Sequence, residues 1–344
     1  MSDAIVLAVD GGNYKTDLTL LRADGDVLAL VRGPQCSPHH LGVDGCLSVL
    51  EDLLARALDD ASLANGRGPV ADVGQLLIAG VDFPAEEEEL QSAAAERGLA
   101  HRLSVANDTF AVLRAGTERG WGVAIVCGAG INCLGVGPDG RHARFPSLGT
   151  ISGDWGGGYD VGLAGLSAAA RSEDGRGPKT SLERAVPAHF ECDTPAAVGE
   201  ALHRGEIDRF RLVELAPVVL AAAADDAVAR SIFDRLADEV VALVRVALER
   251  LDLGAMPAEV LLGGGLTRAA DGRLIGAVEQ RLAEIAPEAT VRATSSPPIV
   301  GAALLGLDAL NAGPEAQTRL RRELDGLVAR IEGRKEEAAR WTSA

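Results

Sequence analysis

The stretch Ile5-Val6-Leu7-Ala8-Val9-Asp10-Gly11-Gly12-Asn13-Tyr14-Lys15-Thr16-Asp17 decides how the N-terminal part of the chain folds. Its first five residues are apolar and predict a buried β-strand, which ends at an acid and two glycines. Paired glycines allow a tight turn and let backbone N–H groups approach an anion closely. The pattern therefore predicts either a plain hairpin turn or an anion-binding loop, in which Lys15 and Thr16 add a cation and a hydroxyl.

The composition indicates an acidic globular protein. The 344 residues are 47% hydrophobic and 24% charged, with a formal net charge of −17, and they suffice for about two domains. This acidity argues against a general nucleic-acid or anionic-membrane surface, so we expect neither partner. The apolar stretch Leu215 to Ala224 is too short to span a bilayer, and Ser2-Asp3 does not begin a signal peptide. Five cysteines without Cys-x-x-Cys spacing indicate reduced thiols, and we expect a cytoplasmic location.

The first hundred residues alternate strand and helix patterns, which is typical of an α/β fold. Two short apolar runs predict a hairpin around Ala23-Asp24-Gly25-Asp26. In order, the expected elements are strands at 18–22 and 27–31, a loop at 33–42, a helix at 43–63, a strand at 73–79, a helix at 86–97 and a strand at 103–106 that ends at Asn107-Asp108.

A second block repeats the opening theme without being a sequence repeat. Trp121–Cys127 predicts an apolar strand, Gly128-Ala129-Gly130 a turn, and Ile131–Val136 a second strand. A long helical region then runs from about 159 to 253, with breaks near 175–178 and Pro195. The remaining expected elements are a strand at 260–262 that runs into Gly263-Gly264-Gly265, a strand at 290–293, a small-residue helix at 298–310 and an amphipathic helix at about 314–339.

Three glycine-rich junctions thus follow apolar strands, at Asp10-Gly11-Gly12, Gly128-Ala129-Gly130 and Gly263-Gly264-Gly265. Together they fit one nucleotide held between two lobes, because glycine lets a backbone lie against a ligand. The alternative is three close-packed turns between strands and helices. The chain contains no P-loop motif, and the weak Gly-x-Gly-x-x-Gly match at 135–140 has the residues of a hairpin turn.

Two carboxylates follow strands at the edge where open α/β sheets bind ligands. Asp10 is suited to hold hydrated Mg²⁺, which needs few protein carboxylates. Asp108 is the candidate catalytic base, because phosphoryl transfer to an alcohol requires a group that accepts the hydroxyl proton. The alternative for Asp108 is a helix N-cap, a position that aspartate commonly occupies.

Other residues are candidates for contact with a polar substrate. Asp154 lies in a glycine-rich loop before a helical pattern, where it either faces sugar hydroxyls or caps the helix. His39 is half of a His-His pair that either contacts substrate or lies in a surface loop, and no third residue gives the spacing of a metal site.

Taken in order, these motifs resemble the actin/hexokinase/heat-shock ATPase superfamily. Within it, the chain is similar to the N-acetylglucosamine kinase-like branch of the BadF/BadG/BcrA/BcrD ATPase family, over residues 4 to about 310. The motifs that carry the resemblance are Asp10-Gly11-Gly12-x-x-Lys15-Thr16-Asp17, Gly42-Val43-Asp44, Asn107-Asp108, Cys127-Gly128-Ala129-Gly130-Ile131-Asn132-Cys133, Gly153-Asp154-x-Gly156, Gly263-Gly264-Gly265 and Gly301-Ala302-Ala303.

The resemblance implies a two-lobed actin-like ATPase fold of ribonuclease H-like topology, with a nucleotide cleft between the lobes. The N-terminal lobe would comprise residues 1–118, with C-terminal helices from about 298–344 packing back on it, and the second lobe residues 119–297. ATP and Mg²⁺ would be the cofactors. Asp108 would be the general base, and Asp10 would be the residue near the metal. The residues implied for ATP are Asp10, Gly11, Gly12, Asn13, Lys15, Thr16, Gly128, Ala129, Gly130, Gly263, Gly264 and Gly265.

The implied activity is phosphorylation of a sugar hydroxyl, in a protein expected to be a homodimer. The substrate-site candidates are Ser37, His39, Asn107, Asn132 and Asp154. Ser37 stands where the animal N-acetylglucosamine kinases have an asparagine, which leaves the sugar open among N-acetylglucosamine, glucosamine and related amino sugars. The alternatives are an ATPase that activates a 2-hydroxyacyl-CoA dehydratase, and a sugar or nucleotide sensor without catalysis.

Overall fold

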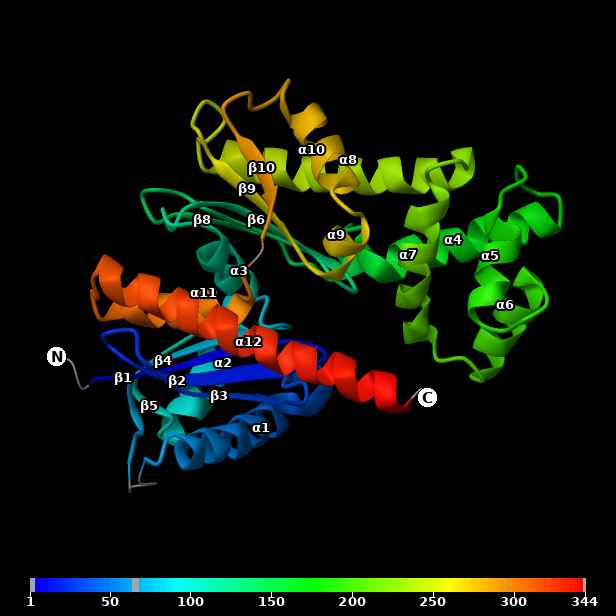
Figure 1. Ribbon diagram of the computed structural model, residues 1–344. Coiled ribbons are helices and arrows are strands. Elements are labelled where there is room, and N and C mark those ends of the chain that lie inside the picture. The colour runs from blue at the N-terminus through cyan, green and yellow to red at the C-terminus, as the bar shows by residue number, and fades with distance from the viewer. Residues whose placement is uncertain (1–3, 64–67, 295, 343–344) are drawn as a thin grey trace. The chain divides into compact units, whose positions relative to one another are not determined.

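The computed structural model describes residues 4–63, 68–294 and 296–342. The chain forms two compact units, one of Met1–Gly120 with Thr294–Ala344 and the other of Trp121–Ala293 (Figure 1). We call them unit 1 and unit 2. Each contains a five-stranded sheet and its own hydrophobic core. Among the described residues, every helix is too short or too polar to span a bilayer.

The sheet of unit 1 is built around β1, which pairs antiparallel with β2 and parallel with β4. Its strand order is β3-β2-β1-β4-β5. The strands are β1 (Ile5–Gly11), β2 (Thr16–Arg22), β3 (Val27–Gly33), β4 (Ala71–Ile78) and β5 (Ala100–Ala106).

Helices cover both faces of this sheet, which explains why β1 is apolar throughout instead of alternating. Leu7 and Val9 belong to the core that includes α1 side chains, whereas Val6 and Ala8 belong to the core built with α11. The C-terminal helices thus return to the first unit, as their orange and red ribbons show (Figure 1). The helices of unit 1 are α1 (Pro38–Asp60), α2 (Pro84–Glu96), α3 (Thr109–Gly116), α11 (Pro298–Ala309) and α12 (Pro314–Thr342).

The sheet of unit 2 is built around β6, which pairs antiparallel with β7 and parallel with β9. Its strand order is β10-β9-β6-β7-β8. The elements are β6 (Gly122–Cys127), β7 (Ile131–Val136), β8 (His142–Arg144), β9 (Glu259–Gly263), β10 (Thr290–Ala293), α4 (Gly157–Glu173), α5 (Leu182–His189), α6 (Pro195–Arg204), α7 (Leu215–Ala222), α8 (Ala227–Arg250), α9 (Gly265–Ala269) and α10 (Arg273–Leu282), with 3₁₀ turns at Gly149–Ile151 and Arg209–Glu214.

Most predicted elements are confirmed; strand β8 was not predicted, and several other elements begin or end at different residues than expected. The first helix begins at Pro38 and not at 43, because Pro38 opens a helical turn that Gly42, with φ 69° and ψ 170°, separates from the rest. Strand β5 begins at Ala100 because it is an edge strand, where exposed polar residues hide the apolar pattern. Pro195 opens α6 instead of only breaking a helix, as proline does at a first helical position.

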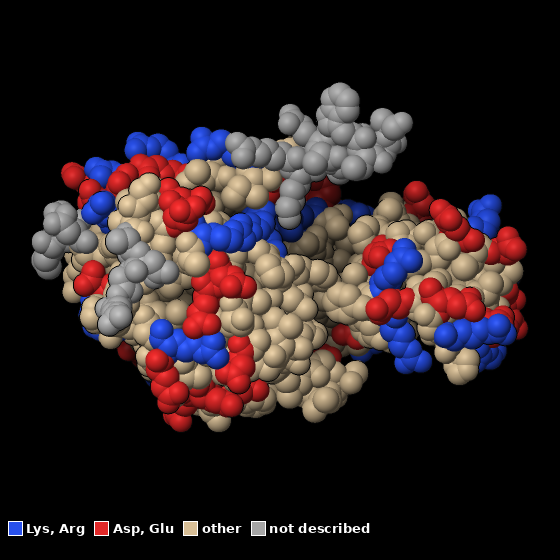
Figure 2. All heavy atoms as spheres, turned by 90° about the horizontal axis from the view of Figure 1, so that it is seen from below, with Lys and Arg blue, Asp and Glu red and all other residues tan. Residues whose placement is uncertain are grey.

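On the face of the molecule that Figure 2 shows, basic side chains lie among the acidic ones. Several of them form ion pairs, such as Arg97 with Glu51 and Asp44. Exposed pairs of this kind contribute little to stability.

Candidate active site

Gly11, at the end of β1, lies against two side chains that leave little room for a larger residue. A Cβ on Gly11 would lie 2.5 Å from Cys36 Sγ and 2.6 Å from Ile78 Cδ1. The Gly11 carbonyl accepts a hydrogen bond from Ala79 N at 2.7 Å, and Gly12 N donates to Lys15 O at 2.9 Å. The end of β1, which carries Asp10, is therefore fixed against β4 on one side and closed by the hairpin to β2 on the other.

The charged residues of this hairpin form a network around Asp17. The Asp17 carboxylate is fully buried and accepts hydrogen bonds from Lys15 Nζ at 2.6 Å and from Arg32 Nε at 2.5 Å and its Nη2 at 2.9 Å. Lys15 is thus paired within unit 1, with 38% of its side chain exposed. The Thr16 hydroxyl is buried and makes no hydrogen bond within the described residues, whereas Asn13 is exposed.

Asp10 is a buried carboxyl in an unfavourable electrostatic environment. Burial, followed by the charges of Asp17 and Asp108, raises its pKa to about 7, while Lys15 and Arg32 oppose the shift. A cation beside Asp10 would relieve this cost, so the environment fits a metal ion. Among the described residues, His, Cys, Asp and Glu form no cluster of three or more suited to a metal. That is compatible with Mg²⁺, which keeps several waters and takes phosphate oxygens as ligands.

Asp108 lies at the junction of β5 and α3, in the position of a helix N-cap. Its carboxylate makes no capping hydrogen bond, so this predicted alternative is not realised. The Asp108 side chain is partly exposed to solvent. Desolvation by burial is nevertheless the largest cause of the shift in its pKa. Burial and then the charge of Asp82 raise the pKa of Asp108 to about 7, and backbone N–H groups partly offset them. A carboxylate with this pKa is a competent base near neutral pH.

The sequence-predicted substrate residues of unit 1 lie at the same edge of the sheet. Asn107 is 3% exposed and bonded through its side chain to Asp82 and Thr109. The turn after β4 lies against Ser37 and His39, since a Cβ at Gly80 would be 2.7 Å from Ser37 Oγ and 3.0 Å from His39 Nδ1.

The His39 imidazole reaches α2, where its Nε2 lies 3.4 Å from Glu86 Oε1. Ser37 is fully buried, and its hydroxyl makes no hydrogen bond within the described residues. Ser37 and His39 thus lie against the turn after β4, and Asn107-Asp108 follows β5. Because β4 and β5 are neighbouring parallel strands, the two turns lie at the same edge of the sheet.

The two glycine junctions of unit 2 contact each other directly. Gly264 has φ +97°, and a Cβ there would lie 2.2 Å from the Cys127 carbonyl oxygen at the end of β6. The carbonyls of Gly128 and Ala129 accept hydrogen bonds at 2.8 and 2.9 Å from the first turn of α4. Apart from the adjacent residues of the chain, no atom of the described residues lies within 4 Å of a Cβ built on Gly128 or Gly130. One side of this turn is thus anchored, and space beside its glycines is open.

Asn132 and Asp154, the predicted sugar residues of unit 2, are joined by one loop. Ser147 Oγ lies 2.6 Å from Asn132 Oδ1, and Leu148 N donates to Ser152 Oγ at 2.8 Å. Ser152 in turn donates to the Asp154 carboxylate. Asp154 also borders a small cavity of about 150 Å³ beside Trp155, whose ring stacks under the Arg235 guanidinium at 4.0 Å.

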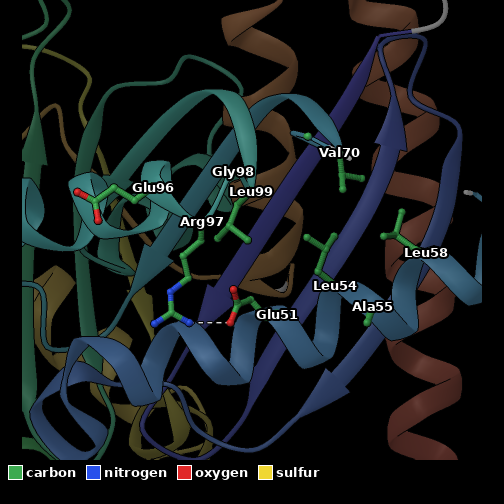
Figure 3. Close-up of a pocket in the computed structure, with 10 residues that line it drawn as sticks. Glu51, Leu54, Ala55, Leu58, Val70, Glu96, Arg97, Gly98 and Leu99 are labelled. Carbon is green, nitrogen blue, oxygen red and sulfur yellow. Dashed lines mark hydrogen bonds and ion pairs between the residues drawn. The ribbon is translucent and has the colours of Figure 1, made fainter. Parts of the chain in front are cut away.

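A larger hollow of about 470 Å³ lies elsewhere in unit 1, against α1 (Figure 3). Leu54, Leu58 and Val70 form an apolar wall, and Arg97 and Glu51 form an ion pair of 2.6 Å beside it. None of the predicted site residues lines it. Size alone would therefore point away from the carboxylates at the strand ends.

These carboxylates and glycine turns match a known family. The model of the BadF/BadG/BcrA/BcrD ATPase family matches residues 7–306. The chain belongs to this family. The resemblance predicted from the motifs is confirmed, and membership of this ATPase family identifies ATP as the nucleotide.

Relatives and solved structures agree with this assignment. An N-acetylmuramic acid/N-acetylglucosamine kinase of Clostridium acetobutylicum is 27% identical over 263 residues, which is 76% of this chain and 85% of the relative. An N-acetyl-D-glucosamine kinase of Dictyostelium discoideum is 26% identical over 326 residues, 90% of this chain and 99% of the relative. A Chromobacterium violaceum structure, provisionally named an N-acetylglucosamine kinase, has a TM-score of 0.70 at 26% identity and covers 89% of this chain and 100% of its own. The predicted actin-like ATPase fold is confirmed.

The cysteines argue against the dehydratase-activator alternative. Cys127 lies on β6 and Cys133 on the neighbouring β7, and both are buried in the core of unit 2. Burial raises the pKa of the Cys127 thiol to about 12. Neither residue offers a thiolate at a surface where two subunits could share an iron–sulfur cluster.

Sequence reasoning missed Asp82, Asp17 and Arg32 as members of the candidate site. Asp82 follows the end of β4 much as Asp108 follows β5, and this shared position was the available signal. Arg32 lies on β3, and only the pairing of β2 with β3 places it beside Asp17.

Proposed function

We propose that this protein is an ATP-dependent sugar kinase that phosphorylates a hydroxyl of an amino sugar such as N-acetylglucosamine or glucosamine. The observation that carries the proposal is the Asp108 carboxylate, which follows a strand end, is free of any capping bond and has a pKa near 7. The relatives that match most of the chain are named as kinases of N-acetylated amino sugars.

The chemistry assigned to Asp108 is proton acceptance. The Asp108 carboxylate takes the proton of the sugar hydroxyl as that oxygen forms a bond to the γ-phosphorus of ATP. The bond from this phosphorus to the β–γ bridging oxygen breaks, and ADP leaves with the electron pair. Burial around Asp108 restricts water, which would otherwise compete with the sugar hydroxyl.

Asp10 is the residue proposed to hold Mg²⁺, which when bound neutralises charge on the ATP phosphates. The turn from Gly11 to Thr16 would present backbone N–H groups to phosphate oxygens. In unit 2, the glycine turns at 128–130 and 263–265 are proposed to contact ATP, and the open space beside Gly128 and Gly130 supports this.

Five residues remain candidates for sugar contact: Ser37, His39, Asn107, Asn132 and Asp154. Two of them are in unit 2, where hydrogen bonds of one loop connect Asn132 on β7 with Asp154.

We further propose that the protein is cytoplasmic and forms a homodimer. Light scattering of the purified protein would test the homodimer.

The decisive experiment is a coupled ADP-release assay with MgATP and a panel of sugars. The panel contains N-acetylglucosamine, glucosamine, N-acetylmuramic acid, N-acetylmannosamine and glucose. We expect a kcat/KM for one amino sugar that exceeds that for glucose by at least about tenfold, because contacts to the 2-substituent add binding energy. Release of ADP that no sugar accelerates, from a protein that binds ATP, would contradict the proposal.

A further inference from the structure

Asp82 lies in the turn between β4 and α2. Strand β4, which leads into this turn, is the neighbour of β5 in the sheet. Its backbone N–H donates to Glu86 Oε2 at 2.8 Å, and the N–H of Phe83 donates to the same oxygen at 3.0 Å. Glu86 lies at the third position of α2 and so fixes the turn from the helix side. The backbone of Asp82 is therefore held in place independently of its side chain.

The Asp82 side chain is bonded to Asn107, the residue before Asp108. Asp82 Oδ1 accepts a hydrogen bond from Asn107 Nδ2 at 2.8 Å. On its other side, Asn107 Oδ1 accepts from Thr109 N at 3.0 Å and from Thr109 Oγ1 at 2.6 Å. A backbone N–H can only donate, so Asn107 must turn its oxygen to Thr109 and its nitrogen to Asp82.

These bonds enclose Asp108 between two fixed neighbours. Asn107 precedes it and is anchored to Asp82, while Thr109 follows it and is anchored to Asn107. Asn107 and Thr109 are 3% and 2% exposed, so water competes little for either bond. The direction in which Asp108 projects thus depends on a side chain that lies 26 residues earlier in the sequence.

We propose that Asp82 is a positioning residue for the catalytic base, acting through Asn107 to hold the turn that carries Asp108. The inference rests on the proposed sugar-kinase function and adds a residue that none of the sequence motifs includes. Displacing a reacting group by about 1 Å costs roughly 100-fold in rate, so a buried anchor at this point matters for kcat. The charge of Asp82 also raises the pKa of Asp108, which places both carboxyls in one electrostatic environment.

Two substitutions of Asp82 separate positioning from direct contact with the sugar. Asp82→Ala removes the acceptor for Asn107, and we expect kcat to fall about 10- to 100-fold with the KM for ATP unchanged. Asp82→Asn retains an oxygen that can accept from Asn107 Nδ2, and we expect kcat within about threefold of wild type. As a control, Asp44→Ala removes a carboxylate that is 94% exposed in the same unit, and kcat should not change. A raised KM for the sugar in both Asp82 variants, with kcat unchanged, would overturn the proposal.

An exchange of the two side chains gives a stricter test. Asn107→Asp alone sets two carboxylates against each other, and we expect a loss of kcat and a lower unfolding temperature. In the double variant Asp82→Asn/Asn107→Asp, the hydrogen bond forms again with donor and acceptor exchanged. Recovery of both kcat and unfolding temperature above the Asn107→Asp values supports the link, and a double variant no better than Asn107→Asp refutes it.

The unfolding measurement keeps this test apart from the proposed function. If the wild-type protein phosphorylates no sugar, the proposed function fails, yet the unfolding temperatures of the Asp82→Asn, Asn107→Asp and double variants still report on the bond between Asp82 and Asn107. If the wild-type protein is active and the exchange rescues nothing, the positioning role fails and the proposed function stands.

Discussion

The two sheets of this protein have the same topology but opposite chemistry at their glycine turns. In unit 1, β1 pairs antiparallel with β2 and parallel with β4; in unit 2, β6 pairs antiparallel with β7 and parallel with β9. The strand orders are β3-β2-β1-β4-β5 in unit 1 and β8-β7-β6-β9-β10 in unit 2. Each strand of the first order corresponds to the strand at the same position in the second.

The difference lies in what each sheet carries at its turns. Unit 1 holds buried Asp10 and Asp17, paired Lys15 and Arg32, and Asp108 at the end of its last parallel strand. The corresponding turn of unit 2 is Gly128-Ala129-Gly130, packed against Gly264 and the start of α4. One topology therefore serves twice, once to place charged side chains and once to place bare backbone. The proposed function therefore assigns proton transfer and metal binding to the carboxylates of unit 1, and backbone contacts with ATP to the glycine turns of unit 2.

The most severe test of this division is Asp108→Asn. We expect kcat for the best sugar to fall about 10²- to 10⁴-fold, because the amide keeps the geometry but cannot accept a proton. ATP affinity, measured by calorimetry, should stay near that of wild type. A variant that turns over at the wild-type rate would show that unit 1 does not supply the base.

The next largest effect is expected from Asp17→Ala. Asp17 is fully buried and Arg32 is 9% exposed, so removing the Asp17 carboxylate leaves a nearly buried cation with only the exposed Glu332 carboxylate, 3.8 Å away. We expect a loss of about 3 kcal/mol of unfolding free energy, measured by urea denaturation. The control is Asp139→Ala on a hairpin of unit 2, where an exposed ion pair with Arg141 should contribute little. Equal effects of the two substitutions would remove the contrast between the units.

The pH dependence should also come from unit 1. The pKa of Asp108 is raised to about 7, so the carboxylate is the dominant form above that pH and the inactive acid below it. We expect kcat/KM to fall about tenfold per pH unit well below 7. The pKa of Asp10 is also raised to about 7, but bound magnesium should lower it. The fall in kcat/KM that excess magnesium does not shift to another pH is therefore the one caused by Asp108. A flat profile from pH 5.5 to 8.5 would contradict this prediction.

The smallest effect is expected at the neutral turn of unit 2. In Gly128→Ala the new methyl group has no atom of the described, non-adjacent residues within 4 Å, so a loss of ATP affinity reports crowding of the ligand itself. We expect affinity to weaken about 3- to 10-fold, or about 1 kcal/mol. Gly199→Ala, on helix α6 with the same open surroundings, is the matched control. Unchanged affinity in both variants would argue that this turn does not contact ATP.

The sequence predicted most elements of both units, because strands such as β1, β3 and β9 end at a glycine and others are followed closely by one. The continuous apolar run of β1 correctly indicated burial on both faces. Edge strands were harder to predict: β5 was expected to start three residues too late, and β8 was not expected at all. Both pair on one side only, so their side chains carry little of the hydrophobic signal.

The candidate site was predictable only where residues are adjacent in the sequence. Asp10 with its glycines, and Asn107 with Asp108, could be read directly. Asp82 could not be linked to Asn107, because 25 residues separate them and the contact depends on β4 and β5 lying side by side. The network around Asp17 likewise needed the register in which β2 pairs with β3.

The sequence by itself determined that apolar strands end in glycine turns and carboxylates, and the order of these motifs predicted the ATPase family. Local preferences suffice for this, since turn chemistry and strand burial act over a few residues. Only the tertiary structure decided that Asp108 is an uncapped, partly buried acid whose pKa lies near 7, and that Asp82 and Asn107 lie beside it. Desolvation and hydrogen bonding depend on groups brought together from distant parts of the chain, and no local pattern encodes them.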